Sequence, residues 1–235
     1  DFDISDRLYV EPLDSESVLD IIDNENNFGI KKQNFQIPSI VQFGGQTAIN
    51  VSQILDETNN PVLGSSAQSI DTASDRHLFE EFLSKTGIPN PPGDTVLTIE
   101  ESVTVANNLG YPVLVRPSYV LGGRAMEIVK NENELSRYIS EAVKVSPDHP
   151  ILLDQYLNNA IEIDVDALCD SNGSVVIAGL MEHVEPAGIH SGDSACCLPS
   201  ISLSKGTLET VKNWTKLIAN RLNVIGLINL QFAVT

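Results

Sequence analysis

Basic residues are scarce in this 235-residue sequence, which contains 14 lysines and arginines against 32 aspartates and glutamates. The resulting formal net charge of −18 at pH 7 disfavours nucleic-acid backbones and anionic membrane surfaces as partners, because both require a basic protein surface. Any phosphate group that the protein binds must be met by a few local arginines and a divalent cation. We therefore expect neither a nucleic-acid partner nor a membrane partner.

Cysteine and long apolar runs are also scarce. The three cysteines, Cys169, Cys196 and Cys197, show no C-x-x-C spacing, and an odd number fits neither a disulfide framework nor a zinc site. This favours a reducing compartment, either the cytoplasm or the stroma or matrix of a eukaryotic organelle, and predicts structural roles for all three thiols. No run approaches the roughly 20 apolar residues of a membrane span. The acidic start, DFDISDRLYVEPLDSE, differs from a targeting peptide and suggests a piece of a longer chain.

The remaining composition predicts a globular α/β protein. Its 42% hydrophobic content can fill one substantial core or two smaller ones. The apolar run 39–43, a helical pattern at 47–55 and the apolar run 61–64 form a β-α-β pattern that is typical of a parallel sheet. Gly44 and Gly45 within it either cradle a phosphate or allow tight packing of strand on helix. Further helices are predicted at residues 15–24, 74–87, 100–109, 132–145 and 205–222.

Two adjacent glycines, Gly122 and Gly123, lie in the segment VLVRPSYVLGGRAMEIVK at residues 113–130. The segment has neither the P-loop spacing nor the G-x-G-x-x-G fingerprint, and the strand-like run after Gly123 places the glycines at the tip of a hairpin. Arg116 and Arg124 lie on either side, and glycine lets a backbone approach a phosphate closely. The hairpin is therefore a candidate nucleotide flap, with an ordinary glycine-containing turn as the alternative.

A strand at residues 160–168 carries three carboxylates. Its strict alternation places four apolar side chains on one face, and it places Glu162, Asp164, Asp166 and Leu168 on the other. This carboxylate face is either solvated or functional, and in the functional interpretation Glu162 accepts hydrogen bonds from a ribose.

The segment MEHVEPAGIHSGDSACCLP, residues 181–199, holds too many polar groups for a plain connector. His183 and His190 allow a transition-metal site, although hydrogen bonds from His190 and Ser191 to a polar ligand are the favoured interpretation. The last predicted strand, GLINLQFAV at residues 226–234, turns Asn229 and Gln231 away from the core.

Taken together, RPSYVLGGRAMEIV, LLDQYL, EIDVDALCD, MEHVEPAGIHSGDSACCLP and LINLQFAV closely resemble the large subunit of carbamoyl phosphate synthetase, an ATP-grasp enzyme. The resemblance covers essentially the whole chain and points to the second synthetase half, which phosphorylates carbamate. It implies a partial, N-terminally incomplete Rossmann-like pre-ATP-grasp unit at residues 1–73. A C-terminally truncated ATP-grasp domain would follow at residues 74–235, with a β-rich lid at about 112–186.

The resemblance also implies roles for individual residues. Arg76 and Arg116 would contact the ATP phosphates and act in catalysis, and Gly122 and Gly123 would close over them. Gln155 and Leu157 would line the adenine pocket, and Glu162 would hold the ribose. The nucleotide-side loop would be formed by Gly188, Ile189, His190 and Ser191. Gln231 would contact the nucleotide and bind Mg²⁺, with Mn²⁺ as the alternative metal.

The implied reaction converts carbamate and ATP to carbamoyl phosphate and ADP. It would form part of carbamoyl phosphate synthesis from bicarbonate, ATP and either glutamine or ammonia, for arginine and pyrimidine biosynthesis. The implied partners are the rest of the large subunit, including the first synthetase half, and a glutamine amidotransferase small subunit. The family continues with a glutamate and an E-x-N-P-R-like segment that completes the Mg²⁺ site. Because one neutral glutamine cannot hold Mg²⁺, we expect the 235-residue chain alone to be inactive.

Two alternatives remain for the same residues. Another ATP-grasp ligase, similar to biotin carboxylase or to a ribonucleotide synthetase, would share the flap but lack GIHSGDS. A non-catalytic nucleotide-binding module would bind nucleotide without Mg²⁺, which calorimetry would detect.

Overall fold

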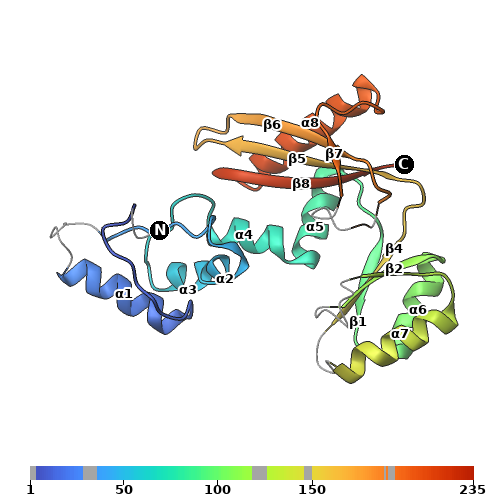
Figure 1. Ribbon diagram of the computed structural model, residues 1–235, viewed down its shortest axis with the longest axis horizontal. Helices are drawn as coiled ribbons and strands as arrows, with labels where there is room; N and C mark the ends of the chain where they lie inside the picture. The colour runs from blue at the N-terminus through green and yellow to red at the C-terminus, as the bar shows by residue number, and fades with distance from the viewer. Residues whose placement is uncertain (1–3, 29–35, 118–125, 146–149, 188, 190–193) are drawn as a thin grey trace. The chain divides into compact units, whose positions relative to one another are not determined.

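The computed structural model describes residues 4–28, 36–117, 126–145, 150–187, 189 and 194–235. Within these residues, five helices precede the first strand, helices and strands are mixed after it, and the strands form two four-stranded sheets, which confirms the mixed α/β fold class (Figure 1). The chain divides into two compact units. The first comprises Asp1–Thr86, Asp166–Ala178 and Glu209–Asn229, and the second comprises Gly87–Val165, Gly179–Leu208 and Leu230–Thr235. No helix within the described ranges is long and apolar enough to cross a membrane.

The N-terminal part of the first unit is helical. Its helices are α1 (Ser15–Phe28), α2 (Gly45–Ile49), α3 (Ser52–Glu57), α4 (Ala67–Ser74) and α5 (Arg76–Thr86). A small core contains Ile22, Val41, Val51 and Leu55. A parallel bridge joins Ser39 and Val62, and the Ser39 N–H donates to the Pro61 carbonyl at 2.8 Å.

The predicted β-α-β pattern is confirmed in its parallel direction but is wrong in its extent. Within the described residues of this region the pairing is limited to the Ser39–Val62 bridge. The single helix predicted at 47–55 is interrupted at Asn50 and Val51, and α4 was not predicted. A Cβ on Gly44 would collide with the Cβ of Ala48, so close packing accounts for this glycine.

Side-chain oxygens cap three helix starts in the described part of this unit. Ser66 caps α4 by accepting a hydrogen bond from the Ser69 N–H at 3.1 Å. Asp14 caps α1 by accepting a hydrogen bond from the Ser17 N–H at 2.8 Å. In α5, Asp75 accepts from the Leu78 N–H at 2.9 Å. Carboxylates at these positions also interact favourably with the positive end of the helix dipole.

The second unit contains an antiparallel sheet in the order β1-β4-β2-β3. Its strands are β1 (Gly93–Val96), β2 (Val113–Pro117), β3 (Glu127–Val129) and β4 (Ile151–Gln155). Leu114 of β2 lies opposite Ile128 on one side and Asp154 on the other. The predicted hairpin is confirmed in its two strands, whereas its tip with Gly122 and Gly123 lies outside the described residues.

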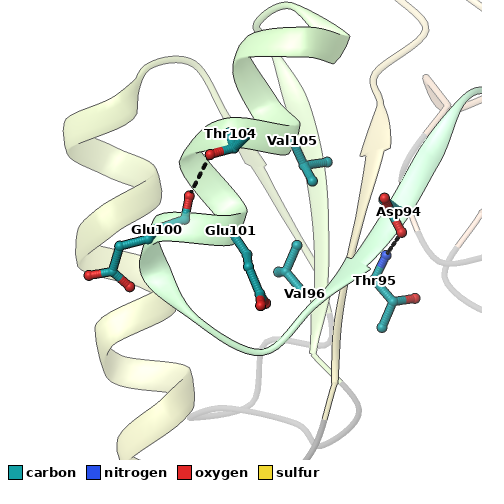
Figure 2. Close-up of a pocket in the computed structure, with 7 residues that line it drawn as sticks. All are labelled: Asp94, Thr95, Val96, Glu100, Glu101, Thr104 and Val105. Carbon is teal, nitrogen blue, oxygen red and sulfur yellow. Dashed lines mark hydrogen bonds between the residues drawn. The ribbon is translucent and has the colours of Figure 1, made fainter.

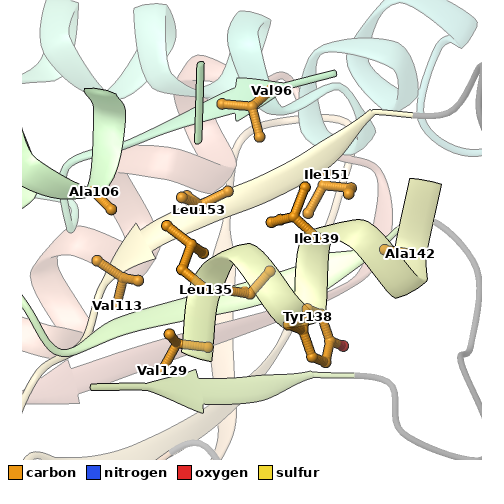
Figure 3. Close-up of a cluster of buried hydrophobic side chains, with 11 residues drawn as sticks. Val96, Ala106, Val113, Val129, Leu135, Tyr138, Ile139, Ala142, Ile151 and Leu153 are labelled. Atoms are coloured by element: carbon orange, nitrogen blue, oxygen red, sulfur yellow. The ribbon is translucent and has the colours of Figure 1, made fainter. Parts of the chain in front are cut away.

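Two helices, α6 (Ile99–Leu109) and α7 (Glu132–Val145), pack with this sheet around one apolar core. Figure 3 shows Leu135 and Ile139 of α7 directed toward Leu153 of β4, and all three side chains are completely buried. The helix predicted at residues 132–145 is confirmed, and its buried residues recur at intervals of three and four: Leu135, Tyr138, Ile139 and Ala142.

The second sheet has the order β7-β6-β5-β8. Its strands are β5 (Ile161–Cys169), β6 (Val175–His183), β7 (Cys196–Cys197) and β8 (Gly226–Val234), and α8 (Lys205–Arg221) precedes β8. The predicted alternation of β5 is confirmed on its apolar face, where the buried residues are Ile163, Val165, Ala167 and Cys169. The opposite face carries the three carboxylates.

Candidate functional site

Arg116 of β2 is held in place by Asp154 of β4. Leu114 lies opposite Asp154, so Arg116, two residues further along β2, shares a face with this carboxylate. The Arg116 Nη2 donates to Asp154 Oδ2 at 2.9 Å, and the two side chains are 46% and 10% exposed, respectively. A guanidinium has five N–H donors, so this contact orients the side chain while further donors face solvent. The arrangement suits the predicted contact with phosphate, which stays a prediction.

A buried histidine lies between two carboxylates of β5. His183, the last residue of β6, has a side chain that is 1% exposed. Its Nε2 lies 2.8 Å from Asp164 Oδ2, and its Nδ1 lies 3.4 Å from Glu162 Oε2. The Glu162 and Asp164 side chains are only 16% and 14% exposed. The solvated interpretation of this face is therefore wrong for both residues, which with His183 form a carboxylate–histidine cluster.

The carboxylate–histidine cluster leaves one acceptor unused. Glu162 Oε2 is buried and has no hydrogen-bond partner among the described residues. A buried acceptor without a hydrogen bond costs about 1–3 kcal/mol, and a ligand hydroxyl that reached Glu162 Oε2 and donated to it would offset this cost. A ribose hydroxyl, the predicted partner of Glu162, has this chemistry.

His183 is the member of the cluster that the sequence did not place there. The sequence suggests this residue only as one ligand of a metal site with His190, which lies outside the described residues. The signal that could have placed His183 is the pair of carboxylates two residues apart on one strand, followed by a histidine at the end of the next strand.

The end of β4 is fixed by main-chain groups from two other segments. The Gln155 N–H donates to the Pro92 carbonyl at 2.9 Å, and the Gln155 Nε2 donates to the Leu109 carbonyl at 3.4 Å. Leu157, two residues further on, is half-buried. The backbone is thus well defined where the adenine contacts are predicted, and these roles stay predictions.

Glu182 is a buried carboxylate for which no role was predicted from the sequence. It accepts hydrogen bonds from the Ser200 hydroxyl at 2.6 Å and the Ser202 hydroxyl at 2.5 Å, and also from the N–H groups of Ile201 and Ser202. Burial alone would favour the neutral acid, but the hydroxyl and N–H donors outweigh it and lower the pKa of Glu182 to about 2. Glu182 therefore anchors the segment that follows β7.

Glu185 has the corresponding role before β7. It accepts from the Ser194 hydroxyl at 2.6 Å and from the Ala195 N–H at 2.7 Å. The bond from Ser194 is the main reason that the pKa of Glu185 is lowered. Together with the bond from the Val184 N–H to the Ala195 carbonyl at 2.9 Å, Glu185 closes the base of the connection between β6 and β7.

Of the other predicted site residues, some lie in the described part of the chain and some lie outside it. Arg76, the first residue of α5, lies in the first unit, where its Nε donates to Glu80 Oε1 at 2.7 Å. Gln231 of β8 and Ile189 are exposed, and the outward direction predicted for the Gln231 amide is confirmed. The predicted residues outside the described part are Gly122, Gly123, Gly188, His190 and Ser191.

The described residues do not by themselves fit a Mg²⁺ centre. They contain no group of three or more His, Cys, Asp or Glu side chains that could hold a metal ion. Gln231 offers one neutral amide oxygen, whereas Mg²⁺ requires an octahedral set of oxygens and is usually bound through carboxylates and substrate phosphates.

All three cysteines are free thiols. Cys169 is buried, which fits the predicted structural role, whereas Cys196 is exposed and its structural role stays a prediction. Adjacent residues of a strand point to opposite faces, so Cys196 and Cys197 of β7 direct their side chains apart.

A hollow of about 460 Å³ lies between β1 and α6, and none of the predicted site residues is among those that line it. Figure 2 shows carboxylates from both elements around it, and its lining consists of Asp94, Thr95, Val96, Glu100, Glu101, Thr104 and Val105. The lining has three carboxylates and no basic side chain, so this hollow disfavours a phosphate-bearing ligand.

Family models match nearly the whole chain. The model described as "Carbamoyl-phosphate synthase L chain, ATP binding domain" matches residues 75–235. The "Carbamoyl phosphate synthase preATP-grasp domain" matches residues 1–72.

Curated relatives agree with the family models. The chain is 53% identical over 242 residues to the carbamoyl phosphate synthase large chain of a Synechocystis species and 52% identical over 234 residues to that of Archaeoglobus fulgidus. All of this chain is covered, but only 22% and 21% of the relatives. The chain therefore spans about a fifth of the length of these proteins.

Solved structures share the fold at low sequence identity. The biotin carboxylase domain of 2-oxoglutarate carboxylase from Hydrogenobacter thermophilus, in complex with MgADP, ADP and bicarbonate, has a TM-score of 0.73 at 24% identity. The similarity covers 99% of this chain and 52% of the biotin carboxylase domain. An ADP complex of N5-carboxyaminoimidazole ribonucleotide synthetase has a TM-score of 0.77 at 13% identity, with coverage of 99% of this chain and 56% of that chain.

Proposed function

Because the chain belongs to the carbamoyl phosphate synthase large-chain family, we propose that it is the nucleotide-binding part of an enzyme that phosphorylates carbamate with ATP. The products would be carbamoyl phosphate and ADP. The observation that carries the proposal concerns Glu162, the residue predicted to hold a ribose: its Oε2 is buried beside His183 and has no hydrogen-bond partner among the described residues. The Arg116–Asp154 pair in the same unit supports it.

Each residue has a defined part in this proposal. Arg116, oriented by Asp154, binds phosphate oxygens, and Glu162 accepts from the ribose. Gln155 and Leu157 border the adenine. The remaining proposed nucleotide contacts are Arg76, Gly122, Gly123, Gly188, Ile189, His190, Ser191 and Gln231. Phosphoryl transfer depends mainly on positioning and on neutralising charge, which are the tasks that arginine and a fixed ribose contact perform.

Metal and partners belong to the same proposal. Mg²⁺, with Mn²⁺ as a substitute, would enter with ATP and neutralise phosphate charge, and Gln231 would supply one oxygen ligand. Since one neutral amide does not hold Mg²⁺, the 235-residue chain alone would be inactive. The proposed partners are the rest of the large chain, including the first synthetase half, and a glutamine amidotransferase small subunit.

The test uses the full-length protein that contains this chain, incubated with carbamoyl phosphate, ADP and Mg²⁺, with ATP as the readout. The wild type should form ATP, and Glu162→Gln should lower kcat/KM at least about tenfold, the effect of a lost hydrogen bond to a charged group. Glu81→Gln is the matched control, because Glu81 is an exposed carboxylate of α5. ATP formation is also measured for the isolated 235-residue chain, and for the full-length protein with Mn²⁺ in place of Mg²⁺.

Each failure points to a different alternative. Nucleotide binding without ATP formation by the full-length protein would favour a non-catalytic module. ATP-dependent turnover of another carboxylate, with none of carbamate, would favour another ATP-grasp ligase. Robust ATP formation by the isolated chain would contradict its proposed inactivity.

A further inference from the structure

Tyr156 connects two segments that carry proposed nucleotide contacts. It lies directly after β4, between Gln155 and Leu157. Its phenol extends toward the connection between β6 and β7, which contains Ile189. Tyr156, Ala187 and Ile189 all belong to the second unit.

The backbone at Tyr156 is a fixed point. The Gln155 N–H donates to Pro92 at 2.9 Å and the Tyr156 N–H donates to Pro112 at 3.3 Å, so segments on two sides hold the end of β4. The Tyr156 side chain is half-buried. A half-buried ring on a fixed backbone can direct its hydroxyl to one place with little loss of conformational freedom.

The hydroxyl of Tyr156 donates to the carbonyl oxygen of Ala187 at 3.3 Å, across 31 residues of sequence. Ala187 lies inside a turn in which the Ile189 N–H donates to the Pro186 carbonyl at 3.4 Å. Glu185 already closes the base of this connection through Ser194 and Ala195. The bond from Tyr156 therefore adds a second attachment, beyond the base and two residues from Ile189.

We propose that Tyr156 is a positioning residue for the nucleotide: its hydroxyl holds the Ala187 carbonyl near the end of β4, so that Ile189 and the Gln155–Leu157 segment contact the same ligand. The identity of that ligand as ATP rests on the proposed function. Tyr156 acts through the Ala187 carbonyl. Phenylalanine would fill the same volume without this bond, so the role depends on a single oxygen atom.

The test compares Tyr156→Phe with wild type in the full-length protein. The variant should raise the KM for ATP about three- to tenfold, the effect of one hydrogen bond, and leave kcat within about twofold. Amide hydrogen exchange of Ala187 and Ile189 without nucleotide should become faster, since the turn loses one attachment. Tyr111→Phe is the matched control, because the Tyr111 hydroxyl is buried and has no partner among the described residues. This control should change neither readout.

The results separate this inference from the proposed function. Unchanged exchange and unchanged KM in Tyr156→Phe would overturn the positioning role, as would a lower kcat at constant KM. Faster exchange with an unchanged KM would also overturn it, because the attachment would then not reach the nucleotide. If the wild type shows no ATP-dependent activity, the proposed function fails, and titration of ADP into wild type and Tyr156→Phe replaces KM as the readout.

Discussion

At the scale of single residues, Glu182 combines burial with charge. It is 7% exposed and receives four hydrogen bonds from the segment after β7. In Glu182→Gln the amide group presents N–H donors where a carboxylate oxygen accepted, so part of this set is lost. We expect the free energy of unfolding of the 235-residue chain at pH 7 to fall by about 1–3 kcal/mol, measured by urea denaturation.

The difference in stability between wild type and Glu182→Gln should depend on pH. The pKa of Glu182 is about 2 in the folded state and has an ordinary value of 4.5. The folded pKa is the lower one, so the contribution of the charge is fully present above about pH 5 and is lost as pH falls toward 2. The stability difference between wild type and Glu182→Gln should shrink over that range. A difference that stays constant from pH 7 to pH 3 would contradict the assignment.

His183 offers a second test at this scale. Replacing it by asparagine removes the imidazole 2.8 Å from Asp164 and leaves two poorly exposed carboxylates side by side on β5. We expect His183→Asn to lower the free energy of unfolding by about 1–3 kcal/mol, the cost of buried polar groups left without a partner. His77→Asn is the control, since His77 is 84% exposed, and it should stay within about 0.5 kcal/mol of wild type. If His183→Asn and His77→Asn lowered the free energy of unfolding equally, the stabilising role of the carboxylate–histidine cluster would be contradicted.

At the scale of elements, the start of α6 provides a test of local structure. Thr98 accepts from the Glu101 N–H at 3.2 Å, and Glu101 accepts in return from the N–H groups of Leu97 and Thr98. Thr98→Ala breaks this capping box and should cost about 1 kcal/mol in urea denaturation. Thr104→Ala in the exposed middle of α6 is the control. It should be neutral or slightly stabilising, because alanine has the higher helix propensity.

Elements with a strong internal pattern could be predicted from the sequence. The bounds of α7 (Glu132–Val145) and β8 (Gly226–Val234) agree with the prediction, because apolar residues recur with the helical period in one and alternate in the other. The break between α2 and α3 carries no such signal. The two-residue strand β7 exists only through its pairing with β6, opposite Glu182 and His183. Tertiary pairing of this kind leaves no local pattern.

At the scale of the whole molecule, long-range contacts limit what sequence order can show. Gln42 donates to the Leu227 carbonyl at 2.6 Å across 185 residues, and Ser65 bonds Ile225 across 160. The first compact unit therefore includes Glu209–Asn229 as well as the N-terminal helices. The division predicted at residue 73 follows the order of the sequence, and it stays a prediction. In the candidate site, Arg116 and Glu162 could be predicted from the sequence as candidate ligand-binding residues. Their partners Asp154 and His183 could not, because these contacts depend on the register between strands.

The net charge of −18 predicts how the whole molecule responds to salt. At about 0.01 M ionic strength the Debye length is about 30 Å, so negative charges repel across the folded molecule, and at about 0.1 M it shortens to about 10 Å. We expect the urea midpoint of the 235-residue chain to rise between about 0.01 and 0.2 M NaCl, because the compact state suffers more self-repulsion than the unfolded chain. MgCl₂ at matched ionic strength is the comparison. The described residues contain no group of three side chains that could hold a metal ion. We therefore expect MgCl₂ to raise the urea midpoint no more than NaCl does at the same ionic strength. A midpoint that falls with NaCl would show that screening weakens ion pairs such as Arg116–Asp154 more than it relieves repulsion.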